Sequence, residues 1–263
     1  MGSTGGKSAK NTQGTMSVIT PGQSDLGQVN TVNTPSQAQQ ANAQVFSDTD
    51  DGQFRNFYGG KKYYQSQTFS IDTQIAVADY LYDKAVDGTL YSPSQNLNYH
   101  MQTDAQLTGQ EIFMRDSLLD GMHNLGYNMN LERYGRVDYI DNFGKIAGLN
   151  INSNNFGNMS EAQLKKAFIG LEYGEKGFVS ASYNQFKNAP AGNSFTDKAV
   201  KINIKAPANA QALMPGIGPG GNLGEIVLAP NQRYRITNVR FTGKSGRSGA
   251  NTYKQIEFDV EMY

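Results

Sequence analysis

The sequence contains no cysteine and only two histidines, His100 and His123. The absence of cysteine excludes disulfide bonds, thiolate metal sites and a cysteine nucleophile. Two histidines give poor support for a histidine-rich metal site, and no serine lies in the elbow motif of a serine hydrolase. We therefore expect no metal cofactor, and we interpret each histidine as a helix-surface or packing residue.

Long apolar runs and an excess of either charge are also missing. No segment approaches the length of a membrane-spanning helix, and the first residues lack the apolar region of a classical signal peptide. The 23 basic and 23 acidic residues balance, so we expect no membrane partner and find no strong signal for nucleic acid. Basic and aromatic residues alternate over 54–64, and we interpret them as an anchor rather than a base-stacking surface.

Residues 1–51 are rich in Ser, Thr, Gln, Asn and Gly, and Phe46 is the one aromatic residue among them. Such a segment cannot bury enough apolar surface to offset its ordering entropy. We predict a flexible low-complexity tail over 1–51 and one domain over 52–263. The tail is either a packaging, translocation or docking segment or a disordered leader. Its composition is compatible with a virion-associated protein or one injected or secreted into a host cell.

Helical signals dominate the first part of the domain. Apolar residues recur at helical spacing from residue 71 onward, and a capping box at Thr108 and Glu111 predicts a second helix that ends near Gly126. Ser160 and Gln163 predict a third, shorter helix in the same way. The residues expected on the inner faces of the first two helices are Ile71, Ile75, Ala78, Tyr82 and Ala85, then Ile112, Phe113, Leu119 and Met122.

Alternating patterns dominate from about residue 178 onward. They are typical of half-buried strands, and they follow the helices without repeating strand–helix units. We therefore predict an α+β fold with two packed antiparallel sheets. The expected inward-facing sets are Val200, Ile202 and Ile204; Tyr234, Ile236 and Asn238; and Ile256, Phe258, Val260 and Met262.

Two motifs that resemble functional sites are better explained by structure. The glycine-rich run 216–221 precedes a strand, whereas a dinucleotide-binding fingerprint opens a helix. The carboxylates of Glu257, Asp259 and Glu261 alternate with apolar residues, so we expect a solvated strand face rather than an acidic site.

Three segments carry the strongest functional signal. Arg133 shares a strand face with the apolar Leu131, and an inward-facing arginine needs an anionic partner. Ser180 and Ser182 share one face of a later strand. Glu225 stands at the start of an apolar strand, where a carboxylate can stabilise positive charge in a glycosyl-transfer transition state. This combination indicates chemistry on a dinucleotide.

The order of these segments resembles the arginine–serine–glutamate class of mono-ADP-ribosyltransferases. This class includes the C2- and C3-like toxins, the insecticidal binary-toxin enzyme component and phage-encoded relatives. The resemblance spans about residues 71–263. Its most specific parts are the sequence GEIVLAPNQRYRI, which begins at Gly224, and KGFVSAS, which begins at Lys176 and is similar to the Phe-x-Ser-Thr-Ser of the class.

The resemblance implies an enzyme that moves ADP-ribose from NAD to a macromolecular acceptor, expected to be a host protein, and releases nicotinamide. Arg133 would bind the pyrophosphate, and Ser180 would orient Glu225. Glu225 would contact the nicotinamide ribose and stabilise the oxocarbenium-like transition state. Ser182 would line the same NAD site, and Tyr183 and Phe186 would either stack on nicotinamide or belong to the core.

The sequence departs from the class at two places. Leu223 stands where related enzymes carry Glu or Gln, so the acceptor residue stays open. Alternation favours Arg133 as the NAD-binding arginine, and Arg136 is the alternative. Two other functions are compatible with the sequence: a non-catalytic virion or structural protein on the same fold, and a β-sandwich module that binds through the loop 215–224.

Overall fold

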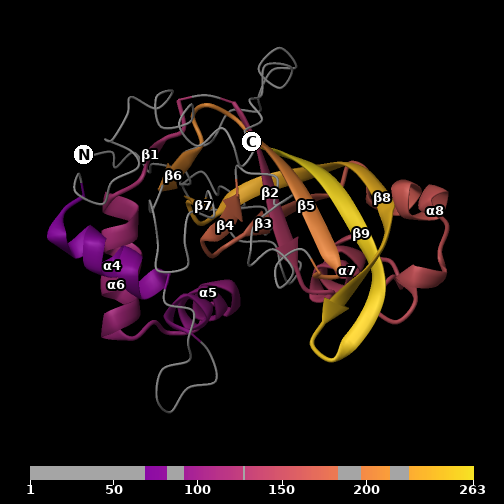
Figure 1. Ribbon diagram of the computed structural model, residues 1–263, viewed down its shortest axis with the longest axis horizontal. Coiled ribbons are helices and arrows are strands. Elements are labelled where there is room, and N and C mark those ends of the chain that lie inside the picture. The colour runs from indigo at the N-terminus through magenta and orange to yellow at the C-terminus, as the bar shows by residue number, and fades with distance from the viewer. Residues whose placement is uncertain (1–68, 82–91, 127, 183–196, 214–224) are drawn as a thin grey trace, which may run out of the picture.

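The computed structural model describes residues 69–81, 92–126, 128–182, 197–213 and 225–263. Three helices lie on one side of a large sheet, near β4, β6 and β7, and two more lie beside the long strands β8 and β9 (Figure 1). No helix in these ranges is both long and apolar enough to cross a membrane. The helices are α4 (Ile71–Tyr80), α5 (Pro93–Thr103), α6 (Gly109–Asp120), α7 (Asp138–Ile146) and α8 (Glu161–Phe168), with a 3₁₀ turn at Phe156–Asn158.

The described strands form one sheet in the order β1-β6-β7-β4-β2-β5-β9-β8-β3. All neighbouring pairs are antiparallel except β5 and β9, which run parallel. The strands are β1 (His123–Asn124), β2 (Met129–Gly135), β3 (Glu172–Glu175), β4 (Val179–Ser182), β5 (Val200–Ala206), β6 (Gln211–Leu213), β7 (Glu225–Leu228), β8 (Gln232–Ser248) and β9 (Asn251–Met262).

The predicted α+β class is confirmed, but the strands form one sheet rather than two separate antiparallel sheets. Its two halves meet where β2 pairs with β4 at a single position, Glu132 opposite Ser182. By contrast, β2 pairs with β5 along its whole length, from Met129 to Gly135. The predicted two sheets are therefore the halves of one sheet, joined at a narrow seam. The tail 1–51 lies outside the described residues.

Two hydrophobic cores occupy different faces of this sheet. Val179 and Ala181 of β4 belong to the larger core, together with α7, α8 and the long strands. Phe178 and Val227 belong to the smaller core, which the helices α4, α5 and α6 cover. The side chains of a strand alternate between faces. The helices α4–α6 therefore cover the face of β4 and β7 that carries Ser180 and Glu225.

Helix caps were easier to predict than helix faces. Both predicted capping boxes form, at Thr108 and at Ser160, and each helix begins at the following residue. The predicted inner faces of α4 and α6 were wrong, because Ile71 is 68% exposed and Leu119 is 40% exposed. The buried residues are Thr73, Ala76, Val77 and Tyr80 in α4, and Glu111, Met114, Ser117 and Leu118 in α6. Ile75, Ala78, Ile112 and Phe113 are exposed too, Met122 is buried as predicted, and Tyr82 and Ala85 lie outside the described residues.

The predicted strand alternation holds except at a bulge. Val200, Ile202 and Ile204 are buried, as are the four predicted apolar residues of β9. In β8, the register against β9 shifts between Ile236 and Asn238. The shift changes which face later side chains occupy, so Val239 rather than Asn238 joins the core.

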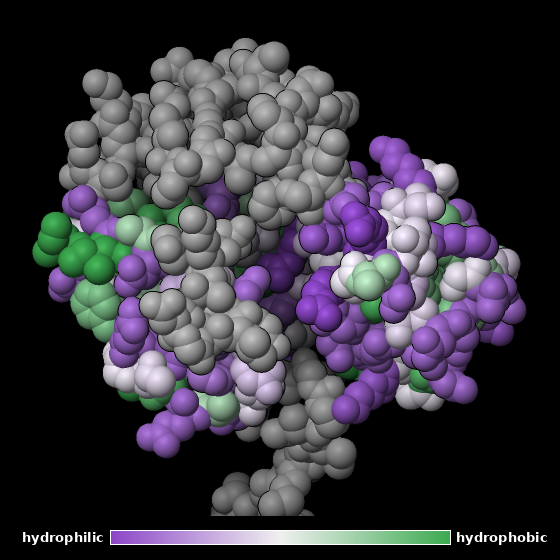
Figure 2. All heavy atoms as spheres, turned by 60° about the horizontal axis from the view of Figure 1, so that its bottom comes forward, coloured by the Kyte–Doolittle hydropathy of each residue, from purple (hydrophilic) through white to green (hydrophobic). Residues whose placement is uncertain are grey.

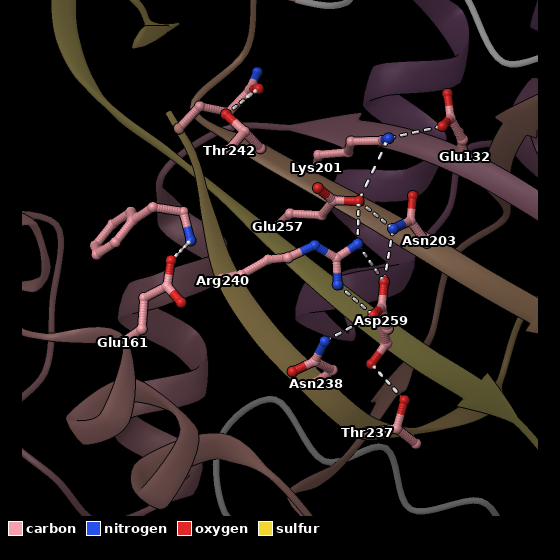
Figure 3. Close-up of polar contacts among 12 residues, drawn as sticks. Glu132, Glu161, Lys201, Asn203, Thr237, Asn238, Arg240, Thr242, Glu257 and Asp259 are labelled. Atoms are coloured by element: carbon pink, nitrogen blue, oxygen red, sulfur yellow. Dashed lines mark hydrogen bonds and ion pairs between the residues drawn. The ribbon is translucent and has the colours of Figure 1, made fainter. Parts of the chain in front are cut away.

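The acidic strand face of β9 is an ion-pair network rather than the solvated surface that we expected. Glu257 is 9% exposed and pairs with Arg240 at 2.7 Å and with Lys201 at 3.5 Å (Figure 3). Lys201 also pairs with Glu132 of β2 at 2.7 Å. Arg240 reaches Asp259 at 2.5 Å. The network thus ties four strands together on one face of the sheet.

Asp259→Asn is expected to lower the free energy of unfolding at pH 7 by about 1 kcal/mol, since a quarter-exposed ion pair is partly screened. Burial alone would raise the pKa of Asp259, but hydrogen bonds from Arg240, Asn203 and Asn238 hold it below its ordinary value. This stability is present above the unfolded pKa, about 3.9, and is lost as pH falls through the lower folded pKa. Urea unfolding at pH 7 and pH 3 should show the variant's deficit shrinking in acid. An equal deficit at both values would contradict the assignment.

Candidate functional site

The seam between the two halves of the sheet brings the three predicted segments onto adjacent strands. Arg133 lies on β2, Ser180 on β4 and Glu225 on β7, and the sheet order places β4 between the other two. These residues are 47 and 45 positions apart along the chain. Neighbouring strands lie about 4.8 Å apart, so this order alone brings their backbones close.

Ser182 and Glu225 are direct cross-strand partners in the β4–β7 ladder. Directly opposed residues in an antiparallel pair project from the same face, and their Cβ atoms lie about 5 Å apart. Ser180 is two residues before Ser182 and shares that face. The two serines therefore lie on one face of β4, and the register adds the carboxylate of Glu225 to the same face.

Arg133 reaches this group from the seam. By alternation its side chain leaves β2 on the side of buried Leu131, and the guanidinium lies 5.8 Å from the ring centre of Tyr139 in α7. Since β2 and β4 pair only at Glu132, Arg133 Nη1 can donate a hydrogen bond to the backbone oxygen of Ser180 at 3.4 Å. The split in the sheet thus allows the guanidinium to come beside β4.

Arg136 occupies a different environment. Its side chain is 71% exposed and lies 3.8 Å from the carboxylate of Asp138 at the start of α7. The half-buried Arg133 contacts β4, whereas no described contact connects Arg136 to β4 or β7. Geometry therefore favours Arg133 as the arginine of this site, in agreement with the alternation of β2.

The positive charge of Arg133 is held without a direct ion pair. No described carboxylate lies within ion-pair distance of its guanidinium, although Glu175 is nearby. The two Glu175 oxygens accept hydrogen bonds from Tyr139 at 2.8 Å and from Gln102 at 2.7 Å. Burial works against the charged form of Arg133, but Tyr139 and Glu175 outweigh it and raise the pKa above its ordinary value. The guanidinium is thus charged and can bind an anionic ligand.

Sequence reasoning missed Tyr80, which lies at the centre of the site. Its hydroxyl is 3.3 Å from Ser180 Oγ and 3.2 Å from Asn98 Nδ2. Burial raises the pKa of the Tyr80 phenol above its ordinary value, and the hydrogen bonds to Ser180 and Asn98 oppose this. The Glu225 carboxylate raises the same pKa and the Arg133 guanidinium lowers it, so both charges lie near the hydroxyl.

A sequence signal for part of this arrangement was present. Ser92, Pro93 and Gln95 form a capping box with proline in the first turn, which predicts a helix that starts at 93 and carries Asn98. No local pattern indicates that Tyr80 contacts a strand 100 residues later. That contact arises only from packing.

The surface is hollowed between the helical side and the strand side, and hydrophilic side chains line the visible part of the hollow (Figure 2). Hydrophobic surface gathers at the left of that view, on the side of α4 and α6. Tyr183, Phe186 and Leu223 lie outside the described residues, as does the loop before Glu225.

Neither histidine belongs to this group. His100 Nδ1 lies 2.7 Å from Glu111 Oε1, which connects α5 to α6, and His123 is exposed on β1. Within the described ranges, no cluster of three potential side-chain ligands is arranged to hold a metal ion. The chemistry of the site therefore rests on an arginine, two serines, a tyrosine and a carboxylate.

Neither a family model nor a curated protein matches the sequence. Solved structures do match the fold. The Clostridium limosum C3 exoenzyme superposes with a TM-score of 0.58 at 16% identity, covering 84% of this chain and 97% of the other. An ADP-ribosyltransferase from Clostridium botulinum gives 0.55 at 16%, covering 83% and 98%. C3stau2 from S. aureus, solved with NAD, gives 0.56 at 13%, covering 84% and 99%. The chain therefore has the fold of the C3-like ADP-ribosyltransferases.

Proposed function

We propose that this protein is a mono-ADP-ribosyltransferase that cleaves NAD, releases nicotinamide and transfers ADP-ribose to a macromolecular acceptor. The observation that carries the proposal is the meeting of Arg133, Ser180 and Glu225 on adjacent strands at the seam of the sheet. A fold alone does not determine function, so this local chemistry has to support it. The β-sandwich alternative does not agree with an α+β sheet covered by helices.

The residues suit the steps that such a reaction needs. Arg133 is charged and not ion-paired with any described carboxylate, and its planar guanidinium can bind the pyrophosphate of NAD. Departure of nicotinamide leaves positive charge on the ribose, which the Glu225 carboxylate can stabilise. Ser180 and Ser182 share its face and can orient the carboxylate or the ligand. A preorganised carboxylate acts most strongly on the transition state.

The acceptor is proposed to be a host protein. In support of this, several proteins with the same fold are described as ADP-ribosylating toxins, among them Plx2a from Paenibacillus larvae, which gives a TM-score of 0.55. Leu223, at the position associated with acceptor choice, leaves the modified residue unassigned.

The test uses the purified full-length protein with NAD labelled in its adenylate group, alone and with cell lysates. We expect free nicotinamide, and in at least one lysate a labelled protein band. If NAD binds but neither nicotinamide nor a labelled product forms with any acceptor, the protein is a non-catalytic member of this fold. Calorimetry with NAD measures the binding independently.

The same assay decides between the two arginines. Arg133→Lys should raise KM for NAD about tenfold, because lysine keeps the charge but loses bidentate binding of phosphate. Arg136→Lys is the matched control and should leave KM unchanged. The reverse result would transfer the pyrophosphate role to Arg136.

A further inference from the structure

Four groups from three elements form a continuous chain of hydrogen bonds that ends at Ser180. The backbone N–H of Phe178 donates to Asn98 Oδ1 at 2.8 Å. Asn98 Nδ2 donates to the Tyr80 hydroxyl at 3.2 Å, and that hydroxyl lies 3.3 Å from Ser180 Oγ. The helices α4 and α5 lie beside the β4 edge from which this chain starts and to which it returns (Figure 1).

The direction of each bond follows from the first one. A backbone N–H can only donate, so it requires the carbonyl oxygen of the Asn98 amide to face Phe178. The amide nitrogen then faces Tyr80 and donates, so the Tyr80 oxygen is an acceptor there. This orientation does not depend on choosing between two equivalent amide flips, because the flipped amide would place two donors against each other.

The remaining proton of Tyr80 then has one destination among the described residues. Tyr80 is 5% exposed, and a buried hydroxyl group is expected to donate as well as to accept. The amide nitrogen of Asn98 cannot accept, which leaves Ser180 Oγ as the described acceptor. The ring of Tyr80 is held in place by an edge-to-face contact with Phe178 at 5.8 Å. Ser180 Oγ is therefore an acceptor toward Tyr80, and its own proton points elsewhere.

We propose that Tyr80 and Asn98 are positioning residues that turn the Ser180 hydroxyl proton away from the helices and toward the side where Glu225 and the substrate lie. The inference rests on the proposed function, because it gives Ser180 the role of hydrogen-bond donor to the Glu225 carboxylate or to the ligand. Without this chain, the hydroxyl would rotate among three staggered positions. With it, the donor is oriented before the substrate binds, which favours the transition state over the ground state.

Two nearly isosteric substitutions test the proposal through NAD cleavage. Tyr80→Phe removes the donor to Ser180 but keeps the ring, so kcat should fall about tenfold while KM stays within about twofold. Asn98→Asp keeps the acceptor for Phe178 and presents a second acceptor to Tyr80. The Tyr80 proton then turns to the new carboxylate, and kcat should fall to a similar level.

The double variant distinguishes a chain from two separate structural effects. If both residues act through Ser180, the variant with both changes should be no slower than the worse single variant. Additive losses, or losses in KM alone, would overturn the proposal. Tyr253→Phe, on the distant β9, is the matched control and should leave kcat and KM unchanged.

Neutron diffraction from deuterium-exchanged crystals tests the direction without any activity. We expect a deuteron on the Tyr80 oxygen that points to Ser180 Oγ. A deuteron on Ser180 Oγ that points back to Tyr80 would overturn the proposal even if the enzyme is active. If the wild-type protein releases no nicotinamide, the proposed function fails, and the neutron result still decides the direction of the chain.

Discussion

Glu225→Gln is expected to reduce kcat for nicotinamide release by a factor of about 100 to 1000. The loss of one preorganised group that stabilises transition-state charge costs about 3–4 kcal/mol. Glutamine keeps the size and hydrogen-bonding capacity of the side chain but not its negative charge, which the oxocarbenium-like ribose needs. Since binding of ground-state NAD depends mainly on other contacts, KM should change little. Rapid-quench or steady-state measurement of nicotinamide release gives both constants.

The control is Glu261→Gln on β9. Glu261 lies 3.9 Å from Lys205 and belongs to the long strands, away from the seam. We expect this variant to keep full activity and an unchanged unfolding curve. Wild-type activity in folded Glu225→Gln would remove Glu225 from the mechanism and reassign the catalytic carboxylate.

Phe143→Ala is expected to destabilise the protein by about 3–5 kcal/mol, the usual cost of deleting a buried phenylalanine ring. Phe143 is 1% exposed, and its ring centre lies 4.7 Å from that of Tyr173 and 5.0 Å from that of Phe258. It thus joins α7 to β3 and β9 in the larger core. A loss of this size is a large part of a typical total stability of about 5–15 kcal/mol.

Urea unfolding measures this loss as a shift of the midpoint at constant slope. Phe113→Ala in α6 is the matched control, because the same atoms are removed from a side chain that is 37% exposed. The control should cost no more than about 1 kcal/mol. Equal losses in the two variants would mean that Phe143 is not a centre of the core.

Local patterns were sufficient for the class of fold and for the order of the site. The capping boxes at Thr108 and Ser160 correctly predicted where two helices begin, since a cap is made within four residues. The alternation in β5 and β9 correctly predicted their buried faces. Arg133, Ser180 and Glu225 could be selected because strand alternation and chemistry are both readable along the chain.

Local patterns failed where the outcome depended on a partner from elsewhere. Ile71 and Ile75 are apolar at helical spacing, yet α4 packs through Thr73, Ala76, Val77 and Tyr80. Thr73 donates to the Ser117 backbone oxygen of α6 at 2.9 Å, a contact that hydrophobicity cannot predict. The bulge in β8 moved Val239 inward for a similar reason, because the register is set against β9.

By itself, the sequence determined which elements form, which strand residues face inward, and that an arginine, two serines and a glutamate occur in the order of a known class of site. Only the tertiary structure decided that β2 and β4 pair at one position, which allows Arg133 to reach Ser180. It also decided that Tyr80 and Asn98 lie in one hydrogen-bonded chain with the serine. The physical reason is range: caps and alternation act over a few residues, whereas the seam and the Tyr80 contact join segments 47 and 100 residues apart.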